Sequence, residues 1–211
     1  MKIAIQTADL DAERIDGTRV YISNLLKYFG KLSPQDDFVI YHRNEFNPEL
    51  IPPDFSNYTV KAFDLSFLWT QLRFAWNVWR DKPEVLWMPM HNLPLLHSKK
   101  MKIVVTAHDL AYKYFPQYFP KKDLIKLNIL GGLAFRMADK IIAISESTKR
   151  DILKFYPSVS EDKIKVIYHG FDAEVYSVQR DLKNENEIKQ KLKINGEYIL
   201  YAGAIQPRKN L

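Results

Sequence analysis

The sequence predicts an α/β fold: a Rossmann-like parallel sheet with helices on both faces. Short apolar runs rich in β-branched residues alternate along the chain with longer segments whose apolar residues recur at helical spacing. A length of 211 residues is enough for one domain with a substantial core, and 46% hydrophobic with 27% charged residues is ordinary for a globular protein. Strands that alternate with helices indicate a parallel sheet covered on both sides.

Seven segments are expected to be strands because they are short, apolar and bounded by turn residues: 2–6, 38–42, 58–63, 85–88, 102–106, 140–144 and 164–168. A helix is expected over 18–32, since its apolar residues form one stripe and Gly30 and Pro34 bracket its end. The stripe consists of Ile22, Leu25, Leu26, Phe29 and Leu32.

Three further helices follow from the same spacing. One spans 68–79, where Leu68, Leu72, Ala75, Trp76 and Trp79 share a face and Pro83 lies beyond the end. Another spans 122–138, with its stripe at Leu124, Leu127, Leu130, Ala134 and Met137. The last begins after Ser145, which can cap it, with Glu146 favourably placed in its first turn.

The segment 177–193 is mostly charged and polar and predicts a connector with a short amphipathic helix. We therefore expect a first domain over 1–180, a connector over 181–197 and the start of a truncated second domain over 198–211. Residues 198–202 read as a strand, which we expect to be poorly anchored because its sheet neighbours are missing. Whether such a truncation is natural or an artefact stays open.

Composition narrows the classes of partner. Zero Cys excludes disulfides and Cys-based metal sites, so a cytoplasmic location is expected, and no run suits a signal peptide or a membrane span. The net charge of +6 suits anionic partners, although an ordinary surface explains it as well. Lys and Arg are scattered rather than gathered in one stripe, so nucleic acid is not expected as a partner.

Polar loops follow the ends of the expected strands, and ligands of open parallel sheets bind there. The candidate site residues in these loops are Gly17, Thr18, Arg19, His91, His108, Asp109, Ser145 and Lys149, followed by Gly203, Arg208 and Lys209 near the end of the chain. Structural explanations stay open for several of them: Thr18 as a helix cap, His91 bonded to a carbonyl, and Ser145 as an ordinary N-cap. His108 and the adjacent Asp109 are not expected to pair, because successive side chains diverge.

The loop 112–122 mixes aromatic residues with lysines. Three interpretations are open: contact with an anionic membrane surface, stacking on a sugar, and a buried aromatic cluster beneath a long loop.

Five stretches, in order, give the chain a resemblance to a known family: GTRVYISNLL, VVTAHDLAYKYFP, ADKIIAISESTKRDI, KIKVIYHGFD and YAGAIQPRKNL. The chain resembles the family-4 retaining glycosyltransferases of the two-domain B-type fold over Met1 to Leu211. The combination AHDL, SESTKRDI and PRKN looks most like the mannosyltransferase-type branch used in polysaccharide synthesis.

The resemblance implies that the first domain binds a glycan or lipid-linked acceptor and the second binds a nucleotide-diphosphate sugar, with retention and with no metal or other cofactor. By motif position it implies that Gly17, Thr18 and Arg19 lie beside the donor phosphates or the acceptor. His108 would approach the donor, and Ser145 and Lys149 would line the cleft. It also implies that Gly203, Arg208 and Lys209 bind the diphosphate of the donor. The negative charge on this leaving group grows in the transition state, and these residues would stabilise it.

Departures from the family pattern are Asp16 before Gly17, Ala204 after Gly203 and His169 in place of a frequent Asn. The acidic pair expected to bind the donor would lie beyond Leu211, so we expect this chain to be the acceptor-binding half and inactive alone. Two alternatives remain: a non-catalytic module for saccharides or phospholipids, and a sugar-nucleotide epimerase, for which the chain shows no convincing carboxylate pair.

Overall fold

The computed structural model describes residues 1–64, 68–173, 176, 181–203, 205 and 209. The chain forms two compact units, Met1–Tyr168 and His169–Leu211, and each is described by itself. In the part of the chain that is described, no helix is both long and apolar enough to cross a membrane.

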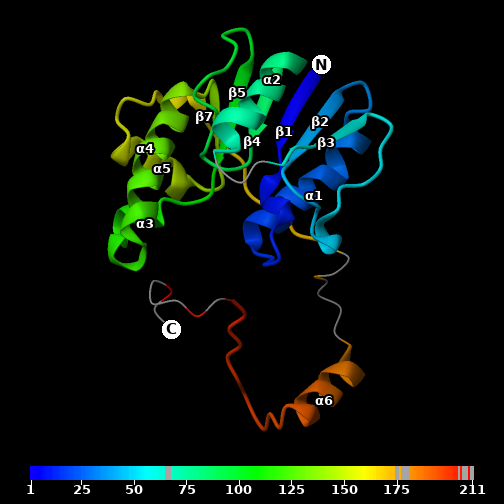
Figure 1. The fold of residues 1–211 in the computed structure, drawn as a ribbon. Helices are drawn as coiled ribbons and strands as arrows, with labels where there is room; N and C mark the ends of the chain where they lie inside the picture. The colour runs from blue at the N-terminus through cyan, green and yellow to red at the C-terminus, as the bar shows by residue number, and fades with distance from the viewer. Residues whose placement is uncertain (65–67, 174–175, 177–180, 204, 206–208, 210–211) are drawn as a thin grey trace. The chain divides into compact units, whose positions relative to one another are not determined.

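A seven-stranded, fully parallel sheet forms the centre of the first unit (Figure 1). The strand order is β3-β2-β1-β4-β5-β6-β7. The strands are β1 Lys2–Gln6, β2 Asp37–His42, β3 Tyr58–Ala62, β4 Val85–Met88, β5 Lys102–Ala107, β6 Lys140–Ala143 and β7 Ile164–Val166. All seven were expected from the sequence, and the α/β Rossmann-like class is confirmed.

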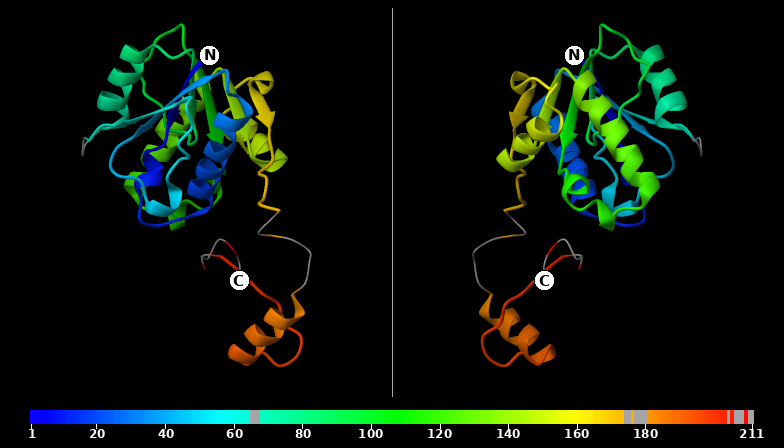
Figure 2. Two further views of the ribbon diagram at one scale, coloured as in Figure 1. Left: turned by 90° about the vertical axis from the view of Figure 1, so that its right-hand side faces the viewer. Right: turned by 90° about the vertical axis from the view of Figure 1, so that its left-hand side faces the viewer.

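Helices connect these strands and pack around the sheet, as the two views of Figure 2 show. The longer ones are α1 Gly17–Leu32, α2 Ala75–Asp81, α4 Lys121–Met137 and α5 Glu146–Phe155. Shorter turns are η1 Ala8–Asp11, η2 Pro48–Leu50, the π-helical η3 Thr70–Phe74, α3 Ala111–Tyr114, η4 Pro116–Tyr118 and η5 Glu161–Lys163. Sequence periodicity predicts the longer helices except at their ends, and it misses the short turns.

Two apolar clusters hold the helices against the sheet. The larger joins β-strand residues to Phe74 and Val78 from the α2 region, Phe135 from α4 and Ile152 from α5. The other joins Ile22 and Leu26 of α1 to β1, β2 and Trp87. The sheet is thus buried between α2, α4 and α5 on one side and α1 on the other, as parallel sheets require.

The expected face of the helix 68–79 is wrong. Leu68, Leu72, Trp76 and Trp79 are exposed, with Trp76 at 58% and Trp79 at 55%, and of that face only Ala75 is buried. The buried apolar residues of this segment are Trp69, Phe74, Ala75 and Val78. The π-turn η3 explains the shift, because a wider turn adds a residue and rotates the apolar stripe around the helix axis.

The second unit contains one helix, α6 Leu182–Lys191, among its described residues. Its N-cap Asp181 accepts a hydrogen bond of 3.1 Å from the backbone N–H of Asn184. The short helix expected in the connector is therefore present. The expected strand over 198–202 does not form: residues 198–203 pair with no strand, and Ile199 and Leu200 are exposed. An apolar run without a sheet partner cannot satisfy its backbone groups as a strand.

The contact pattern divides the chain after Tyr168 and not after residue 180. This division reflects compactness alone, so the domain boundaries at 180 and 198 stay predictions.

Candidate functional site

The candidate residues of the first unit follow the carboxyl ends of parallel strands and lie at one rim of the sheet. Gly17 begins α1 after β1, His91 follows β4, His108 follows β5 and Ser145 follows β6. The sequence argument for one shared rim therefore holds in the structure, whereas the roles of these residues in binding stay predictions.

Gly17, Thr18 and Arg19 form the first turn of α1. Asp16, not Thr18, is the N-cap, and its carboxylate accepts a hydrogen bond of 3.3 Å from the backbone N–H of Arg19. The Arg19 guanidinium forms an ion pair with Asp16 and donates from Nε to the backbone oxygen of Asp9 at 2.9 Å. Arg19 is thus held close to the rim, with part of its charge balanced by Asp16.

His108 is half-buried and fixed by its neighbours. Its Nε2 lies 3.0 Å from the carbonyl oxygen of Pro89, which places the proton on Nε2, since a carbonyl only accepts. The ring packs edge-on against Tyr21 of α1, with centroids 5.1 Å apart. Tyr21 in turn lies 3.5 Å, hydroxyl to hydroxyl, from Thr106. Tyr21 therefore packs α1 against the end of β5.

Ser145 caps α5 and is joined to His108 through Thr148. The Ser145 hydroxyl accepts from the backbone N–H of Thr148 at 3.1 Å and lies 3.0 Å from the Thr148 hydroxyl. That hydroxyl donates to the backbone oxygen of His108 at 3.2 Å. Lys149 forms an ion pair of 2.7 Å with Glu161, and the resulting hydrogen bond raises the pKa of the ammonium group. Glu161 therefore balances the charge that Lys149 was expected to offer.

Asp109 is exposed, and its carboxylate accepts a hydrogen bond of 3.0 Å from the backbone N–H of Ala111 at the start of α3. The aromatic loop that follows is buried in part, and its contact with a membrane or a sugar stays a prediction. Tyr112 is buried and bonded to Tyr156, hydroxyl to hydroxyl, at 2.8 Å. Phe115 and Tyr118 are stacked on each other and remain 37% and 49% exposed.

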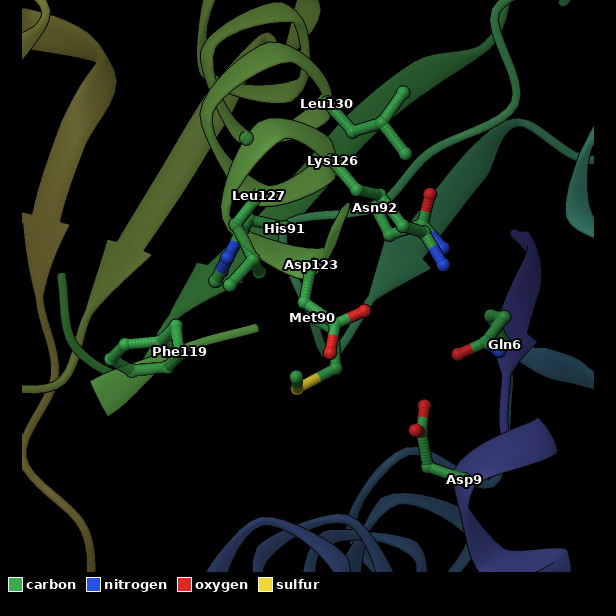
Figure 3. A pocket seen from close by; sticks show the side chains of 11 residues that line it. Gln6, Asp9, Met90, His91, Asn92, Phe119, Asp123, Lys126, Leu127 and Leu130 are labelled. Atoms are coloured by element: carbon green, nitrogen blue, oxygen red, sulfur yellow. The ribbon is translucent and has the colours of Figure 1, made fainter. Parts of the chain in front are cut away.

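A pocket of about 360 Å³ opens at this rim between the end of β1, the β4 loop and α4. Figure 3 shows Gln6 and Asp9 on one side, facing Asp123, Asn92 and Met90 across the opening. The remaining lining residues are His91, Phe119, Lys126, Leu127, Leu130 and Gly131. Burial raises the pKa of the Asp9 carboxyl, and the nearby Arg19 opposes that rise. The pocket thus combines an apolar wall with carboxylates, amides and one ammonium group.

Two buried polar atoms of the pocket have no hydrogen-bond partner among the described residues: Nδ1 of His91 and Oδ1 of Asn92. Burial lowers the pKa of His91 to about 4, so the imidazole is neutral at neutral pH. His91 is packed against Tyr112 and Phe135, with ring centroids 6.1 and 5.7 Å apart. A buried polar atom without a partner costs free energy unless a ligand or water satisfies it.

Gly131 lets helix α4 approach the imidazole. A Cβ at this position would lie 3.1 Å from His91 Cδ2 and 3.1 Å from the Tyr112 hydroxyl. These separations are tighter than ordinary van der Waals contact, so glycine is needed for the observed packing of α4 on the β4 loop.

The candidates near the end of the chain lie in the second unit. Gly203 has φ +157° and is exposed, and Lys209 is exposed as well. Arg208 lies outside the described residues. The diphosphate role of Gly203, Arg208 and Lys209 stays a prediction.

Among the polar residues of the pocket, sequence reasoning selected His91, which Asn92 follows directly. It missed Gln6, Asp9, Asp123 and Lys126. Asp9 lies in η1, a short turn that no periodicity marks. Asp123 and Lys126 precede Leu127 and Leu130 by four residues each, which places them on the same face of α4. That spacing is the signal that could have found them. Among the described residues, no group of three or more His, Asp or Glu side chains is placed to hold a metal ion.

Comparisons with known proteins match this chain to glycosyltransferases. It is 31% identical over 101 residues to a glycosyltransferase of Methanocaldococcus jannaschii named as uncharacterized, covering 47% of this chain and 25% of that protein. The crystal structure of a glycosyltransferase from Rickettsia africae ESF-5 matches with a TM-score of 0.51 and 12% identity, over 92% of this chain and 50% of that one. This likeness concerns the fold.

A second solved structure is the apo form of the lipopolysaccharide outer core galactosyltransferase WaaB, with a TM-score of 0.48 and 17% identity over 82% of this chain and 46% of that one. The matched regions thus cover a quarter to a half of the length of these proteins. The sequence profile described as Glycosyltransferase Family 4 matches residues 15–175, most of the first unit and the start of the second. The chain belongs to Glycosyltransferase Family 4.

Proposed function

We propose that the first unit binds the sugar acceptor of a retaining glycosyltransferase. The observation that carries the proposal is the pocket at the carboxyl rim, where Nδ1 of His91 and Oδ1 of Asn92 are buried without partners. A sugar hydroxyl can both donate and accept, so it suits a neutral imidazole, an amide oxygen and the nearby carboxylates. The apolar wall of Phe119, Leu127 and Leu130 suits the C–H face of a pyranose ring.

The charges of the pocket favour a neutral acceptor group over a phosphate. Asp9 and Asp123 contribute two carboxylates against the single ammonium group of Lys126, and His91 is neutral. A phosphate at this position would meet like charges, whereas a hydroxyl-rich ring would not. On a lipid-linked acceptor, the sugar rather than the diphosphate would therefore occupy the pocket.

In the proposed reaction, the bond between the anomeric carbon and the donor diphosphate breaks, and a bond to the acceptor oxygen forms on the same face. The acceptor proton leaves with a diphosphate oxygen, so atoms and charges balance. His108, held by Pro89 and Tyr21 at the same rim, would contact the donor sugar or its phosphate. Arg208 and Lys209 would stabilise the leaving diphosphate, by resemblance to the family.

The nucleotide-diphosphate sugar is the co-substrate of this scheme, and no metal or other cofactor is part of it. A mannose donor, a polysaccharide product and a cytoplasmic location, with contact to an anionic membrane, complete the proposal. They are supported by motif resemblance and by the absence of Cys. Since the matches cover only a quarter to a half of each relative, we propose that this chain supplies the acceptor half and transfers no sugar by itself. Robust turnover of an activated donor by the full chain would refute that part.

The acceptor site is tested by sugar binding. Saturation-transfer NMR with neutral methyl hexosides should show contact with the full chain, and Asn92→Ala should weaken it by about fivefold, the effect of one lost hydrogen bond. Asn24→Ala is the matched control, because Asn24 is half-buried on α1 and its side chain bonds within its own helix, donating to the Val20 oxygen and accepting from the Lys27 ammonium. Equal binding by wild type and Asn92→Ala, or binding of inorganic phosphate instead of hexosides, would contradict the assignment.

A further inference from the structure

The helix α2 presents aromatic side chains to solvent on the side away from the core. Trp76 and Trp79 are more than half exposed and stack on each other, with ring centroids 5.3 Å apart at 28°. Leu72, one turn earlier, is 56% exposed. Tryptophan is rarely exposed to this extent, and two stacked rings beside a leucine form a continuous apolar strip. We call Leu72, Trp76 and Trp79 the tryptophan strip.

The neighbouring loop extends this apolar surface. The Gln71 side chain donates to the Leu93 oxygen at 3.0 Å and accepts from the Leu95 N–H at 2.9 Å, which fixes the loop after β4 against η3. Leu95 and Leu96 in that loop are 42% and 81% exposed. The same loop begins with His91 and Asn92 of the pocket. The loop after β4 therefore connects the pocket to the apolar surface beside it.

The charges around the strip are basic. Residues 68–82 contain Arg73, Arg80 and Lys82, all exposed, and a single acid, Asp81. Arg73 and Arg80 lie three before and four after Trp76, so they flank the strip on the helix surface. Asp81 offsets them only in part. One carboxylate oxygen accepts from the Tyr41 hydroxyl at 2.6 Å and pairs with the Lys61 ammonium at 2.5 Å, and the other lies 3.7 Å from Arg80 Nε.

We propose that the tryptophan strip is a docking surface for an anionic lipid bilayer, with Trp76 and Trp79 inserted at the headgroup level and Arg73 and Arg80 at the lipid phosphates. Tryptophan prefers the membrane–water interface, and a helix with an apolar aromatic face flanked by arginines lies in that interface. Each basic side chain near an anionic surface adds attraction that falls with salt. This proposal rests on the proposed function in one respect: it gives a site to the membrane contact named there. Bilayer binding does not require sugar transfer, so the docking surface and the acceptor site are tested separately.

Other occupants fit the strip less well. A stable dimer needs about 20–30 residues a side, far more than this strip and its loop offer. A glycan platform would require polar side chains beside the rings to bind hydroxyls, and arginines are the neighbours present here. The exposed Phe115 and Tyr118 form a rival membrane surface, which the experiment separates from the strip.

The test is co-sedimentation of the full chain with vesicles of phosphatidylcholine and phosphatidylglycerol in equal parts. We expect binding that weakens roughly tenfold or more between about 0.05 M and about 0.5 M NaCl, and little binding to phosphatidylcholine alone. Trp76→Ser/Trp79→Ser should abolish the binding, and Arg73→Gln/Arg80→Gln should weaken it by about tenfold. Tyr28→Ser, which removes a 53% exposed aromatic ring from α1, is the matched control and should bind like wild type.

A measurement without mutation guards against misfolded variants. Trp69 and Trp87 are each only 5% exposed, so the part of the tryptophan fluorescence that responds to solvent comes from Trp76 and Trp79. Vesicle addition should shift their emission to the blue, and brominated lipid tails should quench it. Absence of vesicle binding or of quenching would overturn the proposal. The proposal would also be overturned if Phe115→Ser/Tyr118→Ser lost vesicle binding while Trp76→Ser/Trp79→Ser kept it. A dimer in solution that becomes a monomer in the tryptophan variant would overturn it as well, because the strip would then be a dimer interface.

Discussion

The Thr148 hydroxyl donates a hydrogen bond of 3.2 Å to the backbone oxygen of His108, and this bond ties the first turn of α5 to the end of β5. Thr148 also contacts the cap residue Ser145, hydroxyl to hydroxyl, at 3.0 Å. Two segments that sequence reasoning treated as separate candidates are thus one bonded unit. The position of His108 at the rim therefore depends on Thr148, which was not among the candidate site residues.

Thr148→Val should destabilise the first unit. Valine keeps the shape of threonine but removes the hydroxyl, which leaves the His108 carbonyl and the Ser145 hydroxyl without this partner. The expected loss is about 1–3 kcal/mol in the free energy of unfolding, measured by urea denaturation. Thr148→Ser keeps the hydroxyl and should lose less. Equal stabilities of wild type and the valine variant would show that the bond contributes nothing.

Gly131→Ala should destabilise the protein and distort the pocket. The added methyl group would meet His91 and the Tyr112 hydroxyl at 3.1 Å each, and relieving such contacts in a packed core costs about 1–3 kcal/mol. Gly17→Ala is the matched control, because a Cβ there meets no atom within 4 Å. Thermal unfolding of both variants tests this difference, and the packing argument fails if Gly131→Ala is as stable as Gly17→Ala.

The burial of His91 predicts a pH dependence of stability. Its pKa is about 4 in the folded chain against 6.5 in the unfolded one. Between these values the unfolded chain binds a proton that the folded chain does not, so stability falls as the pH drops from 6.5 to 4. Above pH 6.5 both states are neutral and this effect vanishes. Its upper limit is about 3 kcal/mol.

His91→Gln should remove this dependence, because glutamine does not titrate. Urea denaturation at pH 4.5 and pH 7.5 should show a wild-type stability loss that exceeds the loss of His91→Gln. The comparison with the variant cancels the contributions of carboxylates such as Asp9. Parallel pH profiles would mean that His91 is hydrated and titrates normally.

Tyr41→Phe should lower the free energy of unfolding by weakening the contact between β2 and the end of α2. The Tyr41 hydroxyl, on a fully buried ring, donates to Asp81 at 2.6 Å, and burial raises the pKa of this phenol far above its ordinary value. Loss of a hydrogen bond to a charged group costs about 1.5–3 kcal/mol. Chemical denaturation measures the loss, with Tyr28→Phe as a control at an exposed position. A loss no larger than that of the control would contradict it.

The sequence predicted the strands and the shared rim because both follow from local physics. Short β-branched runs such as 102–106 are buried on both faces, and parallel strands place their polar ends together. The pocket could be predicted only in part. His91 and Asn92 stand directly after a strand, whereas Asp9 and Asp123 come from a short turn and a distant helix that only the fold brings together.

The exposed tryptophans illustrate a different limit. Helical periodicity placed Leu72, Trp76 and Trp79 on one face and correctly grouped them, but spacing alone does not say which face is buried. The π-turn at Thr70–Phe74 directs Trp69 and Phe74 to the core and leaves the other stripe in solvent. A single widened turn is a tertiary outcome that no pattern of apolar residues encodes.

The most direct measurement of the central claim is an amide NMR titration of the full, isotopically labelled chain with a neutral hexoside. If the rim of the sheet binds the acceptor sugar, the amide signals of residues 6–9, 90–92 and 123–131 should shift in a saturable way, and those of α6 should not. Shifts confined to other surfaces, or no shift in any of the three segments at saturating sugar, would contradict the claim.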